Sequence, residues 1–90
     1  MKNNDKFKKS RGIIQRPVGD EILLFNQDGS KVLTLNATST LIWKACTGNN
    51  TLDEIAEELK TRYEVNKKQA LIDIKKIVSE LENQDLVRKA

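Results

Sequence analysis

The spacing of apolar and polar residues changes character near residue 36. Before that point, short apolar runs at 13–16, 21–25 and 31–35 are separated by polar turns. Runs of this length between turn residues are typical of strands. The Asp28-Gly29 pair predicts a tight hairpin, because glycine tolerates the positive φ of such turns. Pro17 cannot donate a ladder hydrogen bond, which suits a strand end or a sheet edge. We therefore predict a three-stranded antiparallel sheet.

After residue 36, apolar residues recur every three or four positions, which predicts three helices. Asn36 or Thr38 can cap the first, a capping box at Thr51-Leu52-Asp53-Glu54 opens the second, and Asn66-Lys67-Lys68-Gln69 opens the third. Gly48 is expected to end the first helix in a left-handed cap. The apolar stripes are Leu52, Ile55, Ala56 and Leu59 on the second helix and Ala70, Ile74, Ile77 and Leu81 on the third. The chain is thus expected to be a small α+β domain, three strands followed by three helices.

The third helix carries more apolar surface than a single core contact requires. Leu71 and Val78 are seven residues apart, with Lys75 between them. Such a second stripe can form the wall of a groove beside the sheet, or it can complete the core. The sequence leaves both interpretations open.

Composition excludes several classes of protein. The chain has 90 residues, no histidine and a single cysteine, Cys46. It therefore lacks a Ser-His-Asp or Cys-His nucleophile, an internal disulfide and a CxxC metal clip. Its four glycines are scattered, so it has no glycine-rich phosphate loop. It has neither an apolar run long enough to span a membrane nor a signal-peptide pattern. We expect a cytosolic non-enzyme with no metal and no cofactor.

Positive charge is concentrated in the first eleven residues. Residues 1–11 contain five basic side chains and one acidic side chain, which leaves 11 basic and 12 acidic groups in residues 12–90. We predict that residues 1–11 form a disordered basic tail and that residues 12–90 form the domain. Contact with nucleic acid or with an acidic partner is the alternative role for such a tail.

The ordered series of motifs resembles the PqqD-like family over about residues 13–88. Asp85 stands where that family often has glycine. The matching segments are Leu35-Asn36-Ala37-Thr38, Leu41-Ile42-Trp43, Gly48, Thr51-Leu52-Asp53-Glu54-Ile55-Ala56, Ala70-Leu71-Ile72-Asp73-Ile74, Ile77-Val78, Leu81 and Leu86-Val87.

The resemblance implies a RiPP recognition element with a winged-helix-like fold. Such a module binds the leader of a ribosomally made precursor peptide and presents the peptide to a modifying enzyme, often a radical SAM protein, in pyrroloquinoline quinone, lasso-peptide and related pathways. The leader adds as a strand beside the third strand, in a cleft bordered by the third helix. On this sequence, the implied peptide-binding residues are Lys31, Val32, Leu33, Thr34 and Leu35 of the strand and Leu71, Lys75 and Val78 of the helix.

A DNA-binding winged helix is the alternative. Residues 66–69 would begin its recognition helix, and the basic tail would reach along a groove. The slightly acidic body counts against it, because duplex binders cluster basic residues on one face. A structural subunit of a larger enzyme is a third class. Nucleic acid and membrane are therefore not expected partners.

Overall fold

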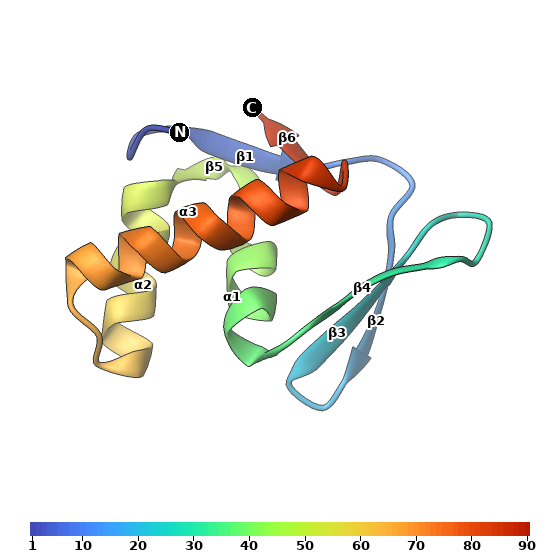
Figure 1. The fold of residues 1–90 in the computed structure, drawn as a ribbon, viewed down its shortest axis with the longest axis horizontal. Helices are drawn as coiled ribbons and strands as arrows, with labels where there is room; N and C mark the ends of the chain where they lie inside the picture. The colour runs from blue at the N-terminus through green and yellow to red at the C-terminus, as the bar shows by residue number, and fades with distance from the viewer.

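The computed structural model describes all 90 residues and contains three helices and six strands (Figure 1). The helices gather on one side, while a strand hairpin projects from them and both chain termini lie beside the same small sheet. The elements are β1 (Lys6–Lys9), β2 (Ile14–Val18), β3 (Glu21–Phe25), β4 (Lys31–Leu35), α1 (Ala37–Ala45), β5 (Thr47–Thr51), α2 (Leu52–Tyr63), α3 (Lys67–Asn83) and β6 (Val87–Lys89).

The predicted α+β class, the three-stranded sheet and the three helices are confirmed. The sheet is an antiparallel meander of order β2-β3-β4. Its first strand continues through Pro17 to Val18, one step further than expected. Ile22 and Leu24 of β3 are buried, and α1 contacts β3 and β4. One face of the sheet therefore packs on the helices.

The predicted disordered tail is wrong for most of its length. Lys6–Lys9 form β1, the central strand of a second antiparallel sheet of order β5-β1-β6. Phe7 is only 3 % exposed and belongs to the core. The carbonyl oxygens of Asn3 and Asp5 accept hydrogen bonds from the first amides of α2, at 2.9 and 3.0 Å. The charged residues around Phe7 gave no strand pattern, and the partners of this strand lie about 40 and 80 residues away along the chain.

The helix starts match the sequence signals more closely than the helix ends. Asn36 caps α1, Thr51 and Glu54 form the reciprocal capping box of α2, and Asn66 caps α3. The expected second box is incomplete, because Gln69 donates its side-chain hydrogen bond to Asp73 instead. The predicted cap at Gly48 is wrong. Helix α1 ends at Cys46, and Gly48 lies in β5 with φ 89°.

The single tryptophan ties the two sheets to α1. Trp43 is buried, and its Nε1 donates a 2.7 Å hydrogen bond to Oε1 of Gln15 on β2. The ammonium of Lys9, on β1, lies 5.1 Å from the Trp43 ring centroid and donates to the carbonyl oxygens of Lys44 and Cys46 at the end of α1. This partial burial lowers the pKa of Lys9. Trp43 is thus a core anchor.

Helix α3 ends in a Schellman motif that leads into β6. The amide of Leu86 donates to the carbonyl of Leu81 at 2.9 Å, and the amide of Asp85 donates to Glu82 at 3.0 Å. Asp85 has φ 57°, the left-handed conformation that favours glycine at this position. This backbone geometry gives a physical reason for the glycine that the resembled family often has here.

Candidate peptide-binding site

The sheet β2-β3-β4 has two free edges with different hydrogen-bonding capacity. Strand β2 contains Pro17, which has no amide proton, and its residues are all exposed. Strand β4 contains no proline and runs without interruption into the cap of α1. About half of the backbone groups of an edge strand point away from its partner and are open to another chain. The β4 edge is therefore the better template for an added strand.

The side chains of β4 grade from buried to exposed. Leu35 is 2 % exposed and pairs with the buried Ile22, while Leu33 pairs with the buried Leu24 but stays half-buried. Val32 is half-buried, and Lys31 and Thr34 are exposed. Leu33 thus lies on the core-facing side of the sheet yet keeps apolar surface at the edge. It is the strand residue best placed to contact an apolar side chain of an added peptide.

The turn before β4 is held by a compact set of polar contacts. The carboxylate of Asp28 accepts hydrogen bonds from the hydroxyl and the amide of Ser30, at 2.7 and 2.9 Å. These two bonds, the hydroxyl first, lower the pKa of Asp28. Gly29 supplies the positive φ of 86°, as the sequence predicted. A fixed turn presents the β4 edge in one conformation, which reduces the entropy lost on binding.

The helix residues predicted for the site are not equivalent. Val78 is 0 % exposed and lies in the core, so the structure assigns it to packing and corrects its place in the predicted wall. Leu71 and Lys75 are half-buried. Both β4 and α3 pack against α1. Of the two open interpretations, core completion holds for Val78, whereas Leu71 retains exposed surface.

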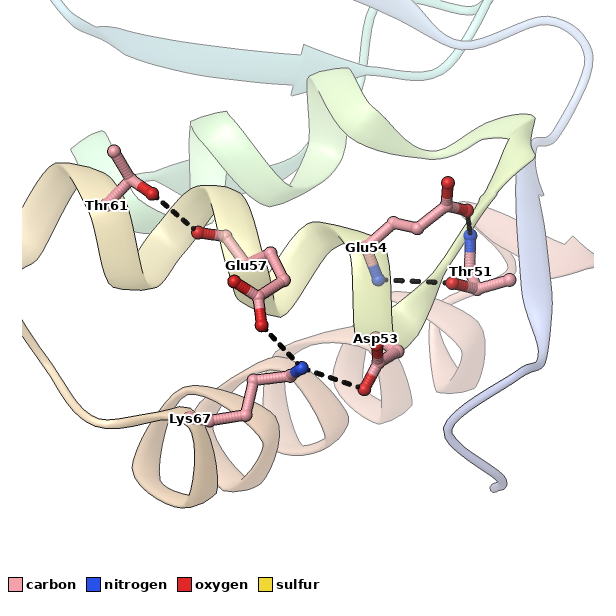
Figure 2. A network of polar contacts seen from close by, with 6 residues as sticks. All are labelled: Thr51, Asp53, Glu54, Glu57, Thr61 and Lys67. Atoms are coloured by element: carbon pink, nitrogen blue, oxygen red, sulfur yellow. Dashed lines mark hydrogen bonds and ion pairs between the residues drawn. The ribbon is translucent and has the colours of Figure 1, made fainter.

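The ion pairs of Lys67 join the start of α3 to α2. Lys67 lies between Asp53 and Glu57 of α2, at 3.1 and 2.7 Å (Figure 2). The hydrogen bond to Glu57 is the largest cause of the raised pKa of Lys67. At about 100° per residue, Lys67 stands within about 20° of the buried Ile74 and Val78, so it extends the core face of α3 and lies between its two flanks.

The opposite flank of α3 carries an apolar residue that sequence reasoning assigned to the core. Ile77 is half-buried and lies three residues after the fully buried Ile74, whereas Leu71 lies three residues before it. At about 100° per residue, these two side chains stand on opposite sides of Ile74. Ile77 is therefore on the flank opposite to that of Leu71 and Lys75. The seven-residue spacing aligned Val78 with Leu71 but could not show that Val78 lies inside the core.

The comparisons with known proteins agree with this architecture. The family model described as coenzyme PQQ synthesis protein D (PqqD) matches residues 21–87. The chain belongs to the PqqD family. No curated protein matches it significantly. The structure of TbiB1 in complex with the TbiA(beta) leader peptide is similar to it, with a TM-score of 0.79, 22 % identity and coverage of 90 % of this chain and 94 % of that chain. Lasso peptide synthetase B1 complexed with the leader peptide is also similar, with a TM-score of 0.79 and 23 % identity. The match covers 92 % of this chain and 98 % of that chain.

This PqqD-family domain keeps its one thiol away from solvent. Cys46 is 1 % exposed, and burial raises the pKa of its thiol to about 11. The thiol is therefore protonated at neutral pH and is a poor nucleophile. No group of three or more Cys, Asp or Glu side chains is arranged to hold a metal ion, and no helix is long and apolar enough to cross a membrane.

Proposed function

We propose that this PqqD-family domain binds the leader segment of a ribosomally made precursor peptide by strand addition to β4. It presents the peptide to a separate modifying enzyme, such as a radical SAM protein, and carries out no chemistry of its own. The observation that carries this proposal is the free, proline-free β4 edge beside the half-buried Leu33. The leader peptides held by the two similar structures support it, as does the buried, protonated thiol.

Main-chain pairing gives affinity, and the side chains beside the edge select the sequence and register. An extended peptide antiparallel to Lys31–Leu35 alternates its side chains between the two faces of the sheet. On the core-facing side it meets Leu33 and a wall from α3. We assign that wall to Ile77, a half-buried apolar residue at the margin of the core, and Leu71 with Lys75 on the opposite flank is the alternative. Burying one leucine-sized anchor there contributes about 1.5–3 kcal/mol.

A backbone-modified peptide tests strand addition without changing the protein. The probe is a synthetic leader of the precursor encoded beside this chain's gene, N-methylated at alternate residues. In one peptide the methyl groups replace the amide protons that face β4. In the matched control they replace the amide protons that face solvent. Each lost hydrogen bond removes about 0.5–1.5 kcal/mol, so the first peptide should bind about tenfold or more weakly and the control nearly normally.

The readout is nuclear magnetic resonance titration of the labelled domain, with Kd from fluorescence anisotropy. We expect the largest shifts at Val32–Leu35 and Ile77. Equal loss of affinity for the two N-methylated peptides would contradict strand addition. Shifts confined to α1 and α2 would place the peptide elsewhere and contradict the site.

The structure weakens the DNA-binding alternative, because the residues at the start of α3 have partners within the fold. Lys67 is paired with two carboxylates, Asn66 caps the helix, and Gln69 donates to Asp73. The basic segment that would serve as an arm contains β1. Duplex DNA is expected to bind weakly and with a steep salt dependence. Sequence-specific binding that persists at physiological salt would favour the DNA-binding class instead.

A further inference from the structure

The polarity of strand addition determines where the bound peptide leaves the domain. This step rests on the proposed function. A peptide antiparallel to β4 has its N-terminal end beside Leu35 and its C-terminal end beside Lys31. Lys31 is opposite Phe25, and Phe25 is opposite Ile14. These three residues form one row across the sheet, at the end where the peptide leaves it.

A hollow lies on this row, on the face of the sheet opposite the buried side chains. It has a volume of about 240 Å³ and is lined by Ile14, Arg16, Phe25 and Gly29. Ile14 is 46 % exposed, although it is a large apolar residue in a regular strand. The space beside Gly29 is open, since a Cβ built there would meet no atom within 4 Å. The hollow is small enough for one side chain.

The one charged side chain that lines the hollow is basic. The guanidinium of Arg16 lies 5.9 Å from the Phe25 ring centroid, and Arg16 takes part in no ion pair. The carboxylate of Asp28, in the turn beside the hollow, accepts hydrogen bonds from Ser30 and forms no ion pair with Arg16. An arginine stacked on an aromatic ring, with its N–H donors free, recognises a carboxylate well. The site therefore favours an apolar side chain accompanied by an acidic one.

We propose that this hollow binds the part of the precursor directly C-terminal to its strand-forming segment, through one apolar and one acidic side chain. Strands are spaced about 4.8 Å apart, so the path from the added strand across β4 and β3 to β2 is about 14 Å. An extended chain covers this path in about four or five residues. The acidic and apolar residues are thus expected about four to six positions after the segment that pairs with β4.

A second copy of the chain is a poorer occupant of the same surface. Three strands of five residues cover about 14 by 17 Å, or about 240 Å². A stable dimer buries about 800 Å² per partner. The patch is too small for a lasting dimer but large enough for the continuation of a peptide already anchored at β4.

The experiment uses peptides selected from a random phage-displayed library on the full-length domain, so that no cognate precursor is required. Selected peptides whose titration shifts Val32–Leu35 are then shortened from their C-terminal end and measured against four proteins. These are the wild type, Arg16→Glu, Ile14→Asp and the matched control Val18→Asp. Val18 is 57 % exposed on the same face of β2, but it pairs with Glu21 at the other end of the strand.

We expect removal of the C-terminal residues, Arg16→Glu and Ile14→Asp each to weaken binding about tenfold, with Val18→Asp unchanged. Replacing the acidic residue of the peptide by lysine should restore binding to Arg16→Glu. Shifts at β4 without any effect of truncation or of Arg16→Glu would overturn the subsite and leave the β4 proposal intact. Equal losses for Ile14→Asp and Val18→Asp would also overturn it. Peptides that bind without shifting β4 would contradict strand addition itself.

Discussion

The two small sheets of this domain are built in opposite ways. The sheet β5-β1-β6 joins three segments from the beginning, middle and end of the chain and places Phe7 of its central strand in the core. The sheet β2-β3-β4 is a local meander whose strands follow one another within residues 14–35. The first sheet joins the two ends of the chain to its middle by backbone hydrogen bonds. The second sheet projects from the helices and keeps a free edge (Figure 1). Stability and recognition are thus assigned largely to different sheets, and substitutions should separate them.

The largest effect is expected in the sheet that closes the fold. Phe7→Ala removes a buried aromatic ring and should lower the free energy of unfolding by about 3–5 kcal/mol. Urea denaturation followed by circular dichroism measures this change. Lys8→Ala, at the next and exposed position of β1, is the control and should change stability by less than about 0.5 kcal/mol. A disordered N-terminal segment would instead make the two variants equally mild.

The contrast between the sheets also explains what the sequence could predict. The meander and the helix starts depend on neighbouring residues, such as Asp28-Gly29 at the turn and the Thr51 to Glu54 box, and they were predicted. Strand β1 was missed, because a single phenylalanine among lysines carries no period of its own. Its burial depends on Thr47–Thr51 and Val87–Lys89, and no local pattern shows that these segments meet.

The limit of the core on α3 could not be predicted from the sequence, for a related reason. Val32 and Leu33 keep accessible surface, as an edge strand in contact with a peptide requires. On α3, the spacing of apolar residues showed that a second stripe exists but not where the core ends. That boundary depends on the angle at which α3 lies on α1 and α2. As a result, Val78 is buried and Ile77 is partly accessible, the reverse of the expectation.

A matched pair on α3 tests which flank faces the peptide. Ile77→Asp places a charge in the proposed wall and should weaken leader binding about tenfold or more. Leu71→Asp makes a comparable change at a half-buried residue on the opposite flank, and it should weaken binding less than about threefold. Anisotropy gives Kd, and thermal unfolding confirms that both variants fold. A larger loss of affinity for Leu71→Asp than for Ile77→Asp would show that Leu71 and Lys75 form the wall.

The capping box tests whether the region around β5 acts on stability alone. Thr51→Ala removes the acceptor of the Glu54 amide and should cost about 0.5–2 kcal/mol in unfolding free energy, with leader Kd unchanged. Hydrogen bonds from Thr51 hold the pKa of Glu54 below its usual value of 4.5. This contribution is therefore present above about pH 4.5 and is lost as the pH falls through the lowered pKa. Thr51→Ala keeps the Thr51 backbone amide, the larger cause of this lowered pKa, so stability measured between pH 3 and 6 should depend only slightly less on pH in the variant. An unchanged free energy of unfolding at pH 7 would contradict the contribution of the box.

The smallest expected effect is a gain in stability at the entry to β6. Asp85 adopts φ 57° in the Schellman motif of α3, where an L side chain crowds the backbone. Asp85→Gly relieves this strain, and the greater freedom of glycine in the unfolded chain offsets part of the gain. We expect a net increase of about 0.5–1 kcal/mol in the free energy of unfolding, measured by urea denaturation. Asp85→Ala is the control: it removes the same carboxylate but keeps the Cβ, so it should not stabilise. Because β6 belongs to the sheet β5-β1-β6 and not to the sheet of β4, leader affinity should be the same in the wild type and both variants. A change in Kd would show that the two sheets are coupled.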